Sequence, residues 1–133
     1  MAKKPKAATG PVVGWLDAPE EHDYPAAASY LSLVATPDVV AVVVAKLKAG
    51  TVDHFKAKDI LRAAGLPLLG TTNPHVASDL AKIAAGSALS PVLLVRGDLD
   101  RGLPMQIADG YHRVCACYHT DENIDIPCIV VDR

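Results

Sequence analysis

A short apolar run from Val92 to Val95 constrains the fold of this chain more than any other feature. The run begins after Pro91 and ends at Arg96, so it is too short for a buried helix and has the length of a strand. Its lack of polar residues is typical of a strand that is covered on both faces. A β-branched run from Ile126 to Val131 predicts another strand near the end of the sequence. Strands of this kind require helices packed against the sheet.

The most distinct helix signal lies between Asn73 and Gly86. Asn73 is a typical N-cap residue, the proline after it suits the first helical position, and an apolar stripe at helical spacing follows. The valine run within 38–48 is also compatible with a strand, but Thr36 before it and Gly50 after it favour a helix. The sequence further predicts helices over 25–33, 57–64 and 110–120, and strands over 51–55 and 105–108.

The length and composition are those of one ordinary domain, since the chain has 133 residues and half of them are hydrophobic. We expect a flexible leader over residues 1–12, which lack periodicity, and a single domain over residues 13–133. The predicted fold class is α/β, more specifically α+β. It consists of a small mixed sheet packed with helices, with extra helices in the N-terminal half.

Charge and cysteine content narrow the classes of function. The formal net charge of -2 lacks the basic excess that is typical of proteins that grip nucleic acid. The one basic cluster, Lys3, Lys4 and Lys6, is explained by a solubilising tail. No apolar run is long enough to span a bilayer, and three cysteines without a secretion signal favour a reducing compartment. We therefore expect a cytoplasmic protein with no membrane partner.

The densest chemistry lies at the predicted strand-to-helix junction that begins at Asp109. A glycine at such a junction, here Gly110, leaves backbone N–H groups free at the positive end of the helix dipole, where anions bind. The guanidinium of Arg113 has paired N–H donors that suit phosphate oxygens. The imidazole of His112 can donate a hydrogen bond, and histidine changes its protonation near neutral pH. Asp109 suits a Mg²⁺ ligand or a proton acceptor, although it also suits a helix N-cap. The spacing indicates a phosphate site without fixing its chemistry.

Three segments extend this interpretation: Pro91-Val-Leu-Leu-Val-Arg96, Ile107-Ala-Asp-Gly-Tyr-His-Arg-Val-Cys-Ala116 and Ile126-Pro-Cys-Ile-Val-Val131. They follow the order of an apolar strand, a strand that ends in a glycine-initiated helix motif, and a closing strand around a proline. This order resembles the family of ParB N-terminal domains and sulfiredoxins. The resemblance covers residues 73–132 and hardly reaches the first half of the chain. It implies a stand-alone domain with the ParB/sulfiredoxin-like fold.

The junction can be compared with two motifs of that family. Gly110, Arg113 and Ala116 match the ParB signature Gly-Glu-Arg-Arg-x-Arg-Ala, which contacts nucleotide phosphates. The positions that depart from that signature are Tyr111, His112 and Cys115. Gly110, His112 and Arg113 match the sulfiredoxin motif Gly-Cys-His-Arg. This chain has Tyr111 at the position where that motif has its nucleophilic cysteine. The departures disfavour ParB-type CTP hydrolysis and cysteine-based repair, whereas phosphate binding is compatible with both.

The resemblance implies a domain that binds a purine or pyrimidine nucleotide. The implied phosphate-binding residues are Gly110, Tyr111, His112, Arg113 and His75. For His75, an exposed position in the first turn of its helix is the alternative that we favour. Asp109 is the implied ligand of a Mg²⁺ that accompanies a nucleoside triphosphate. If the nucleotide is hydrolysed or its phosphoryl group is transferred, Asp109 and His112 are the implied catalytic residues.

Two other classes of function stay open. The first is a non-catalytic interaction module that uses the first half of the chain to bind a protein or a DNA partner. The second is a nuclease of the kind often attached to ParB-like sequences. We rank the nuclease last because it needs clustered carboxylates, and only Asp109 stands in a motif.

Several other polar residues have weaker patterns. His112, Cys115 and His119 share one face of the predicted helix and suit Zn²⁺, but three ligands from one helix make a weak site, so we favour chance proximity at the surface. Cys117 and Cys128 are interpreted as small core residues. The remaining candidates for ligand contacts are His54, Lys56 and Arg96, and Trp15 and Tyr24 are expected to pack the N-terminal segment onto the domain.

Overall fold

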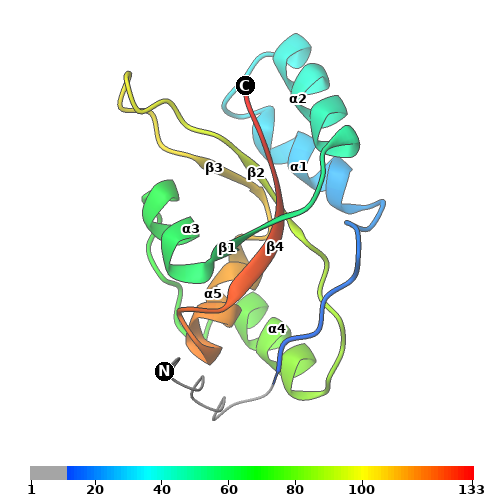
Figure 1. Ribbon diagram of the computed structural model, residues 1–133, viewed down its shortest axis with the longest axis vertical. Coiled ribbons are helices and arrows are strands. Elements are labelled where there is room, and N and C mark those ends of the chain that lie inside the picture. The colour runs from blue at the N-terminus through cyan, green and yellow to red at the C-terminus, as the bar shows by residue number, and fades with distance from the viewer. Residues whose placement is uncertain (1–11) are drawn as a thin grey trace, which may run out of the picture.

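The computed structural model describes residues 12–133 as one four-stranded sheet with helices on both faces (Figure 1). Lys3, Lys4 and Lys6, like the predicted leader up to residue 11, lie outside the described residues. The elements in chain order are α1 (Asp23–Leu31), α2 (Pro37–Ala49), β1 (Asp53–Lys56), α3 (Ala57–Ala64), α4 (Pro74–Ala84), β2 (Val92–Val95), β3 (Gln106–Asp109), α5 (Tyr111–Thr120) and β4 (Asp125–Val131). This compact α+β fold confirms the predicted fold class.

The sheet is mixed and has the strand order β1-β4-β2-β3. The two central strands, β2 and β4, are parallel neighbours, with Val92 beside Cys128 and Val95 beside Val131. β1 pairs with β4, and β3 pairs with β2, both in the antiparallel direction. Every residue of β2 is buried, as its continuous apolar run predicts for a strand that is covered on both faces.

Alternate residues of the central strands point into two separate cores. On one face, Val92, Leu94 and Cys128 pack with residues of α3, α4 and α5. On the other face, Leu93 and Ile129 pack with residues of α1 and α2. Figure 1 shows α1 and α2 together, apart from the other three helices. The two N-terminal helices therefore cover the face of the sheet that would otherwise be open to water.

Local signals account for several helix ends. The Asn73 side chain caps α4, because its Oδ1 accepts hydrogen bonds from the N–H groups of His75 at 3.0 Å and Val76 at 3.2 Å. Gly65 ends α3 with a φ of +65°, which is the usual left-handed helix stop. α2 begins at Pro37 and is a helix, as the flanking signals predict, in spite of its valines.

The structure moves several predicted boundaries. α1 ends at Leu31, two residues earlier than predicted. β1 and β3 begin later than predicted, at Asp53 and Gln106. β3 continues to Asp109, so the N-cap of α5 is Gly110 and the alternative that Asp109 is the N-cap is wrong. Strand limits depend on the pairing partner, and the sequence of one strand does not reveal that partner.

The segment before α1 lies against the loop that precedes β2. The Leu16 N–H donates to the Leu89 carbonyl at 2.8 Å, and the Leu89 N–H donates to the Gly14 carbonyl at 2.9 Å. Trp15 packs against the core that includes α3, α4 and α5, which we call the first core, and Tyr24 packs against the core that includes α1 and α2. These contacts confirm the predicted packing of the N-terminal segment onto the domain. Among the described residues, no helix has both the length and the apolar character that crossing a membrane requires.

Candidate functional site

The chain passes from β3 into α5 through Gly110, and only glycine fits this position. The φ of Gly110 is +108°, in a region that other residues avoid. A Cβ on Gly110 would also lie 2.5 Å from Cγ1 of Val92. The helix can therefore begin directly at the end of β3. In the described part of the chain, no side chain caps this end of α5, so its first N–H groups face outward without a side-chain acceptor.

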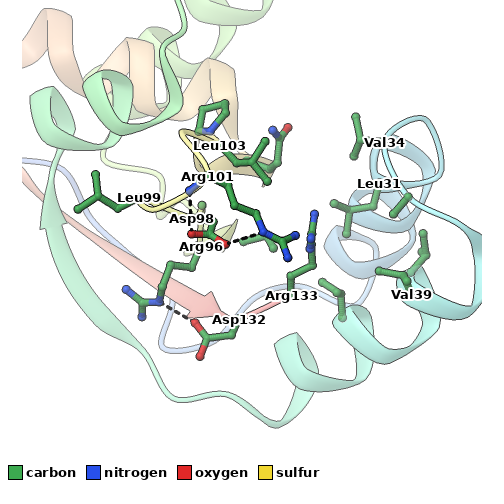
Figure 2. Close-up of a pocket in the computed structure, with 17 residues that line it drawn as sticks. Leu31, Val34, Val39, Arg96, Asp98, Leu99, Arg101, Leu103, Asp132 and Arg133 are labelled. Atoms are coloured by element: carbon green, nitrogen blue, oxygen red, sulfur yellow. Dashed lines mark hydrogen bonds and ion pairs between the residues drawn. The ribbon is translucent and has the colours of Figure 1, made fainter.

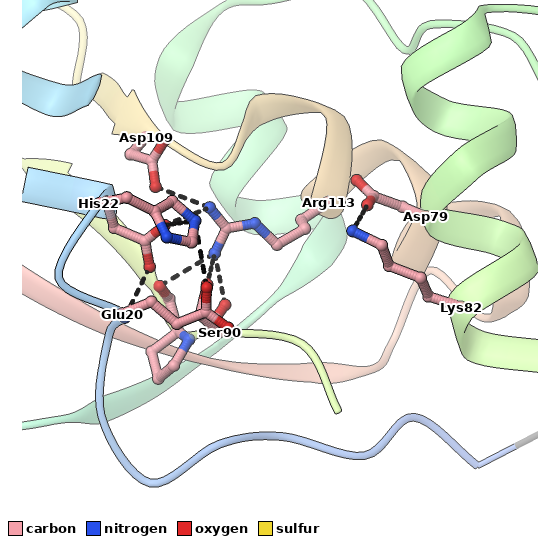
Figure 3. A network of polar contacts seen from close by, with 9 residues as sticks. Glu20, His22, Asp79, Lys82, Ser90, Asp109 and Arg113 are labelled. Carbon is pink, nitrogen blue, oxygen red and sulfur yellow. Dashed lines mark hydrogen bonds and ion pairs between the residues drawn. The ribbon is translucent and has the colours of Figure 1, made fainter. Parts of the chain in front are cut away.

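Arg113, in the first turn of α5, is held by contacts within the protein (Figure 3). Its Nη1 donates to the backbone oxygen of Ser90, to Ser90 Oγ at 2.7 Å and to the Pro91 carbonyl at 3.1 Å. Its Nη2 donates to Asp109 Oδ2 at 2.7 Å. These bonds tie the start of β2 to the end of β3. The phosphate contact expected of Arg113 stays a prediction, because internal acceptors engage both terminal nitrogens.

The same guanidinium also reaches the N-terminal layer of the fold. Asp23, the first residue of α1, is buried, and its Oδ1 lies 3.8 Å from Nη2 of Arg113. Its Oδ2 accepts a hydrogen bond from the Glu20 N–H at 2.9 Å, and His22 Nε2 lies 3.4 Å from its Oδ1. Arg113 therefore connects α1, through the buried Asp23, to the β3–α5 junction.

A cavity of about 210 Å³ opens between the β3–α5 junction and α4. α4 contributes a single helix face, because residues three and four apart in a helix lie on the same side. The lining residues are His75, Ser78, Asp79 and Lys82 from α4, and Asp109, Gly110, His112 and Arg113 from the junction. The fold thus brings together five of the residues singled out in the sequence: His75, Asp109, Gly110, His112 and Arg113.

The rings of His75, His112 and Tyr111 lie next to one another, and the two imidazoles line the cavity. The ring centroids of His75 and His112 are 4.7 Å apart, and Tyr111 stacks on His112 at 5.7 Å. The Tyr111 hydroxyl, however, donates to the Pro67 carbonyl at 2.6 Å and does not line the cavity. In this geometry Tyr111 supports His112 and anchors the loop before α4, so its expected contact with phosphate is not favoured.

Burial and neighbouring charges set the protonation of His112. Burial, and then the proximity of His75, lower the pKa of His112, and Asp79 opposes the shift. The ring is therefore mainly neutral near pH 7, as one donor and one acceptor. An anion in the cavity would reverse this balance by stabilising the protonated ring.

The charged side chains around the cavity form two ion pairs. Lys82 Nζ lies 3.8 Å from Asp79 Oδ1, and Arg113 Nη2 lies 2.7 Å from Asp109 Oδ2. Burial raises the pKa of Asp109, although the ion pair with Arg113 opposes the increase. The four charges cancel within these pairs, so the positive end of the α5 dipole supplies the electrostatic preference for an anion.

The carboxylates beside the cavity do not form a ready-made site for Mg²⁺. Proteins usually hold Mg²⁺ with one or two carboxylates together with phosphate oxygens and water. Here Asp79 and Asp109 are both engaged in ion pairs. Throughout residues 12–133, no group of three or more His, Cys, Asp or Glu side chains is arranged to hold a metal ion. The Mg²⁺ ligand role expected of Asp109 stays a prediction.

The residues of the zinc-suited helix face separate in the structure. Cys115 is fully buried in the first core, so the expected proximity at the surface is wrong for this residue. His119 Nε2 lies 2.7 Å from the Leu69 carbonyl. Cys117 and Cys128 are buried core residues, as predicted.

The other candidates for ligand contacts lie away from the cavity. His54 is exposed on β1. Lys56 Nζ lies 3.8 Å from Asp125 Oδ1, and Arg96 Nε lies 2.7 Å from Asp132 Oδ1. None of the three lines the cavity.

Sequence reasoning missed part of the site. Ser78, Asp79 and Lys82 were not identified, although their helical spacing from His75 places all four on one face of α4. Asp23 carries no sequence signal for its contact with Arg113, because the two meet only through tertiary packing.

The candidate site is a small cavity between one face of α4 and the N-terminal end of α5, which has no side-chain cap among the described residues. Comparisons of the chain with protein-family models, with curated proteins and with solved structures found no match.

Proposed function

We propose that this protein binds a phosphate-bearing ligand and holds its phosphate group in the cavity between α4 and the β3–α5 junction. The observation that carries the proposal is the convergence of Lys82, His75 and His112 on one cavity with the N-terminal end of α5. Ammonium, imidazole and backbone N–H groups are all donors suited to phosphate oxygens. Ser78 adds a hydroxyl on the same wall.

The size of the cavity limits which part of a ligand it can hold. A volume of about 210 Å³ suits a phosphate or diphosphate group and is too small for a whole nucleotide. The nucleotide expected from the sequence resemblance would therefore place its phosphates inside and its sugar and base outside. We propose this class of ligand on the combined support of the resemblance and the donor set.

The proposal covers binding and no chemical step. Asp109, one expected catalytic residue, pairs with Arg113 at 2.7 Å and so helps to fix the junction. The other expected catalytic residue is His112, which in this proposal donates a hydrogen bond to the ligand. Lys82 lies 3.8 Å from its carboxylate partner, which leaves its ammonium able to turn toward an anion. Binding of this kind needs no metal.

A thermal-shift series on the full chain tests the proposal. The ligands are pyrophosphate, ATP, CTP and GTP, each with and without Mg²⁺, and sodium chloride at matched ionic strength is the blank. Binding to the folded state alone raises the melting temperature, so we expect a rise of several degrees with pyrophosphate and with at least one nucleotide. No rise with any of these ligands would overturn the proposal.

Single-residue variants test whether the ligand-induced rise in melting temperature comes from this cavity. Lys82→Ala should remove most of the ligand-induced rise, because it removes the mobile ammonium from the cavity wall. Lys58→Ala is the matched control, since Lys58 is exposed on α3 away from the cavity. Arg113 is unsuited to this test, because its internal contacts make its loss a folding defect. An equal rise in wild type and Lys82→Ala would place the ligand elsewhere.

A further inference from the structure

A second and larger cavity lies between the α1–α2 pair and the loop that connects β2 to β3 (Figure 2). It is a groove of about 590 Å³ and shares no lining residue with the cavity at the β3–α5 junction. Its volume falls within the roughly 300 to 1,000 Å³ that is typical of sites for small ligands. The groove is therefore a separate candidate site, independent of the proposed function.

The two facing walls of the groove are aliphatic. The wall from the α1–α2 pair includes Leu31, Val34 and Val39, and the loop wall includes Leu103. Val34 is 54% exposed, Leu103 is 43% exposed and Val39 is 37% exposed. These side chains face the gap between the two walls and are only partly covered by the protein. A hydrocarbon chain between the walls would remove them from water.

Charged groups at the groove are dominated by arginine. Three arginines and two aspartates line it, and each aspartate pairs with one arginine. Arg96 Nε lies 2.7 Å from Asp132 Oδ1, and Arg101 Nε lies 3.6 Å from Asp98 Oδ2. Arg133 supplies the third guanidinium. Figure 2 shows Arg101 and Arg133 directed toward one another into the groove. Two like charges that face each other repel, and an anion between them would offset the repulsion.

The loop that carries Arg101 has a defined conformation before any ligand binds. The N–H groups of Asp100 and Arg101 donate to Asp98 Oδ1 at 3.0 Å and 3.3 Å. Backbone hydrogen bonds of 3.0 Å and 2.9 Å join Asp98 to Leu103. A Cβ on Gly97 would lie 2.3 Å from the Leu103 carbonyl, so the two arms of the loop are in close contact. Arg101 is therefore presented from a fixed turn, which reduces the entropy lost on binding.

We propose that this groove is a second binding site, for a small amphipathic anion that joins an aliphatic chain to a carboxylate. The chain lies between Val34 and Val39 on one side and Leu103 on the other. The carboxylate lies between Arg101 and Arg133, where planar guanidinium groups match its two oxygens.

The probe for this proposal is decanoate, titrated at millimolar concentrations below micelle formation into the full, isotope-labelled chain. Backbone amide chemical shifts report the site of binding. We expect saturable shifts within residues 31–43 and 95–106, which carry the two walls. The cationic amphiphile decyltrimethylammonium, which has the same chain length, should cause no saturable shift in these segments. Equal responses to both amphiphiles would contradict anion recognition and would overturn the proposal.

Charge-reversal variants test the role of the guanidinium groups. The double variant Arg101→Glu/Arg133→Glu should weaken decanoate binding by about tenfold or more, which corresponds to at least one lost charged contact. Arg62→Glu is the matched control, since Arg62 is exposed on α3 and forms the same kind of i,i+3 pair with an aspartate as Arg101 does. Both side chains of the double variant are at the surface, so amide dispersion should confirm an intact fold. Unchanged affinity in the folded double variant, or shifts confined to another region, would overturn the proposal.

Discussion

The imidazole rings of His75 and His112 lie 4.7 Å apart, measured between their centroids, although one ring belongs to α4 and the other to α5. Both residues line the small cavity at the β3–α5 junction. The proximity of His75 disfavours the protonated form of His112, and an anion beside both rings would stabilise that form. Anion binding and proton binding at this site are therefore coupled.

We predict that sulfate binds more tightly as the pH falls from about 8 to about 5.5, the range in which histidine titrates. Sulfate stands in for phosphate because its own charge is constant over this range. The lowered pKa of His112 keeps its ring neutral in the protein without ligand, whereas the anion favours the protonated ring. Binding therefore takes up a proton, and affinity rises as the pH falls toward that lowered pKa and levels off below it. Isothermal titration calorimetry at several pH values measures the dependence.

Two glutamine variants separate this effect from a general response to acid. His112→Gln should flatten the dependence of sulfate affinity on pH. His54→Gln should leave it unchanged, because His54 is an exposed residue of β1 outside the cavity. A sulfate affinity that does not depend on pH in the wild-type chain would rule out the coupling.

We predict that Arg113→Lys lowers the free energy of unfolding by about 2 to 4 kcal/mol, because it breaks an ion pair that is largely shielded from water. The Arg113 side chain is 13% exposed and bonds Ser90 and Asp109 with different nitrogens. A lysine ammonium cannot span these acceptors. Urea denaturation followed by circular dichroism measures the change. Arg62→Lys, at a side chain that is 85% exposed, should change stability by about 0.5 kcal/mol or less. Similar losses for both variants would contradict the central position of Arg113.

We predict that Gly110→Ala destabilises the fold far more than Gly65→Ala. Both glycines have positive φ, so both variants carry backbone strain of about 1 to 2 kcal/mol. A Cβ at Gly65 meets nothing within 4 Å, whereas a Cβ at Gly110 would lie 2.5 Å from Val92 Cγ1. Overpacking of this kind adds about 1 to 3 kcal/mol. Melting temperatures of the two variants provide the comparison, and equal losses would show that Val92 yields without cost.

We predict that the three cysteines resist a thiol-reactive disulfide reagent in the native protein at pH values up to about 9, because the thiolate is the reactive form. All three side chains are buried. Burial raises the pKa of Cys117 to about 12 and that of Cys128 to about 12. In denaturant all three should react rapidly. Rapid native labelling of Cys117 would show that the first core opens more readily than its packing indicates.

The parts of the fold that could be predicted from the sequence are those with local signals. Asn73 caps α4 with its own side chain, Gly65 ends α3, and the four apolar residues of β2 need cover on both faces. The limits of the outer strands have no such local basis. Asp53, for example, begins β1 because it pairs with Cys128, which lies far along the chain.

The same distinction between local signals and contacts with distant segments applies to the candidate site. The Gly110 turn was predictable because a glycine between a strand and a helix is a local pattern. The contacts of Arg113 with Asp23 and Ser90 were not, because they arise only when three distant segments pack together. For this reason the sequence indicated a guanidinium free to bind phosphate, where the structure has a largely covered side chain with internal hydrogen bonds. The place of Lys82 on the cavity wall could be recognised only from the three-dimensional position of α4.

The most direct test of phosphate binding at the junction is a titration of the full, isotope-labelled chain with pyrophosphate, observed through backbone amide chemical shifts. We expect the largest saturable shifts at Tyr111, His112 and Arg113, whose N–H groups begin α5, together with shifts along 75–82. Amides of the second groove, over 96–104, should not respond. The absence of saturable shifts at the start of α5, or a response confined to other parts of the chain, would contradict the proposed function.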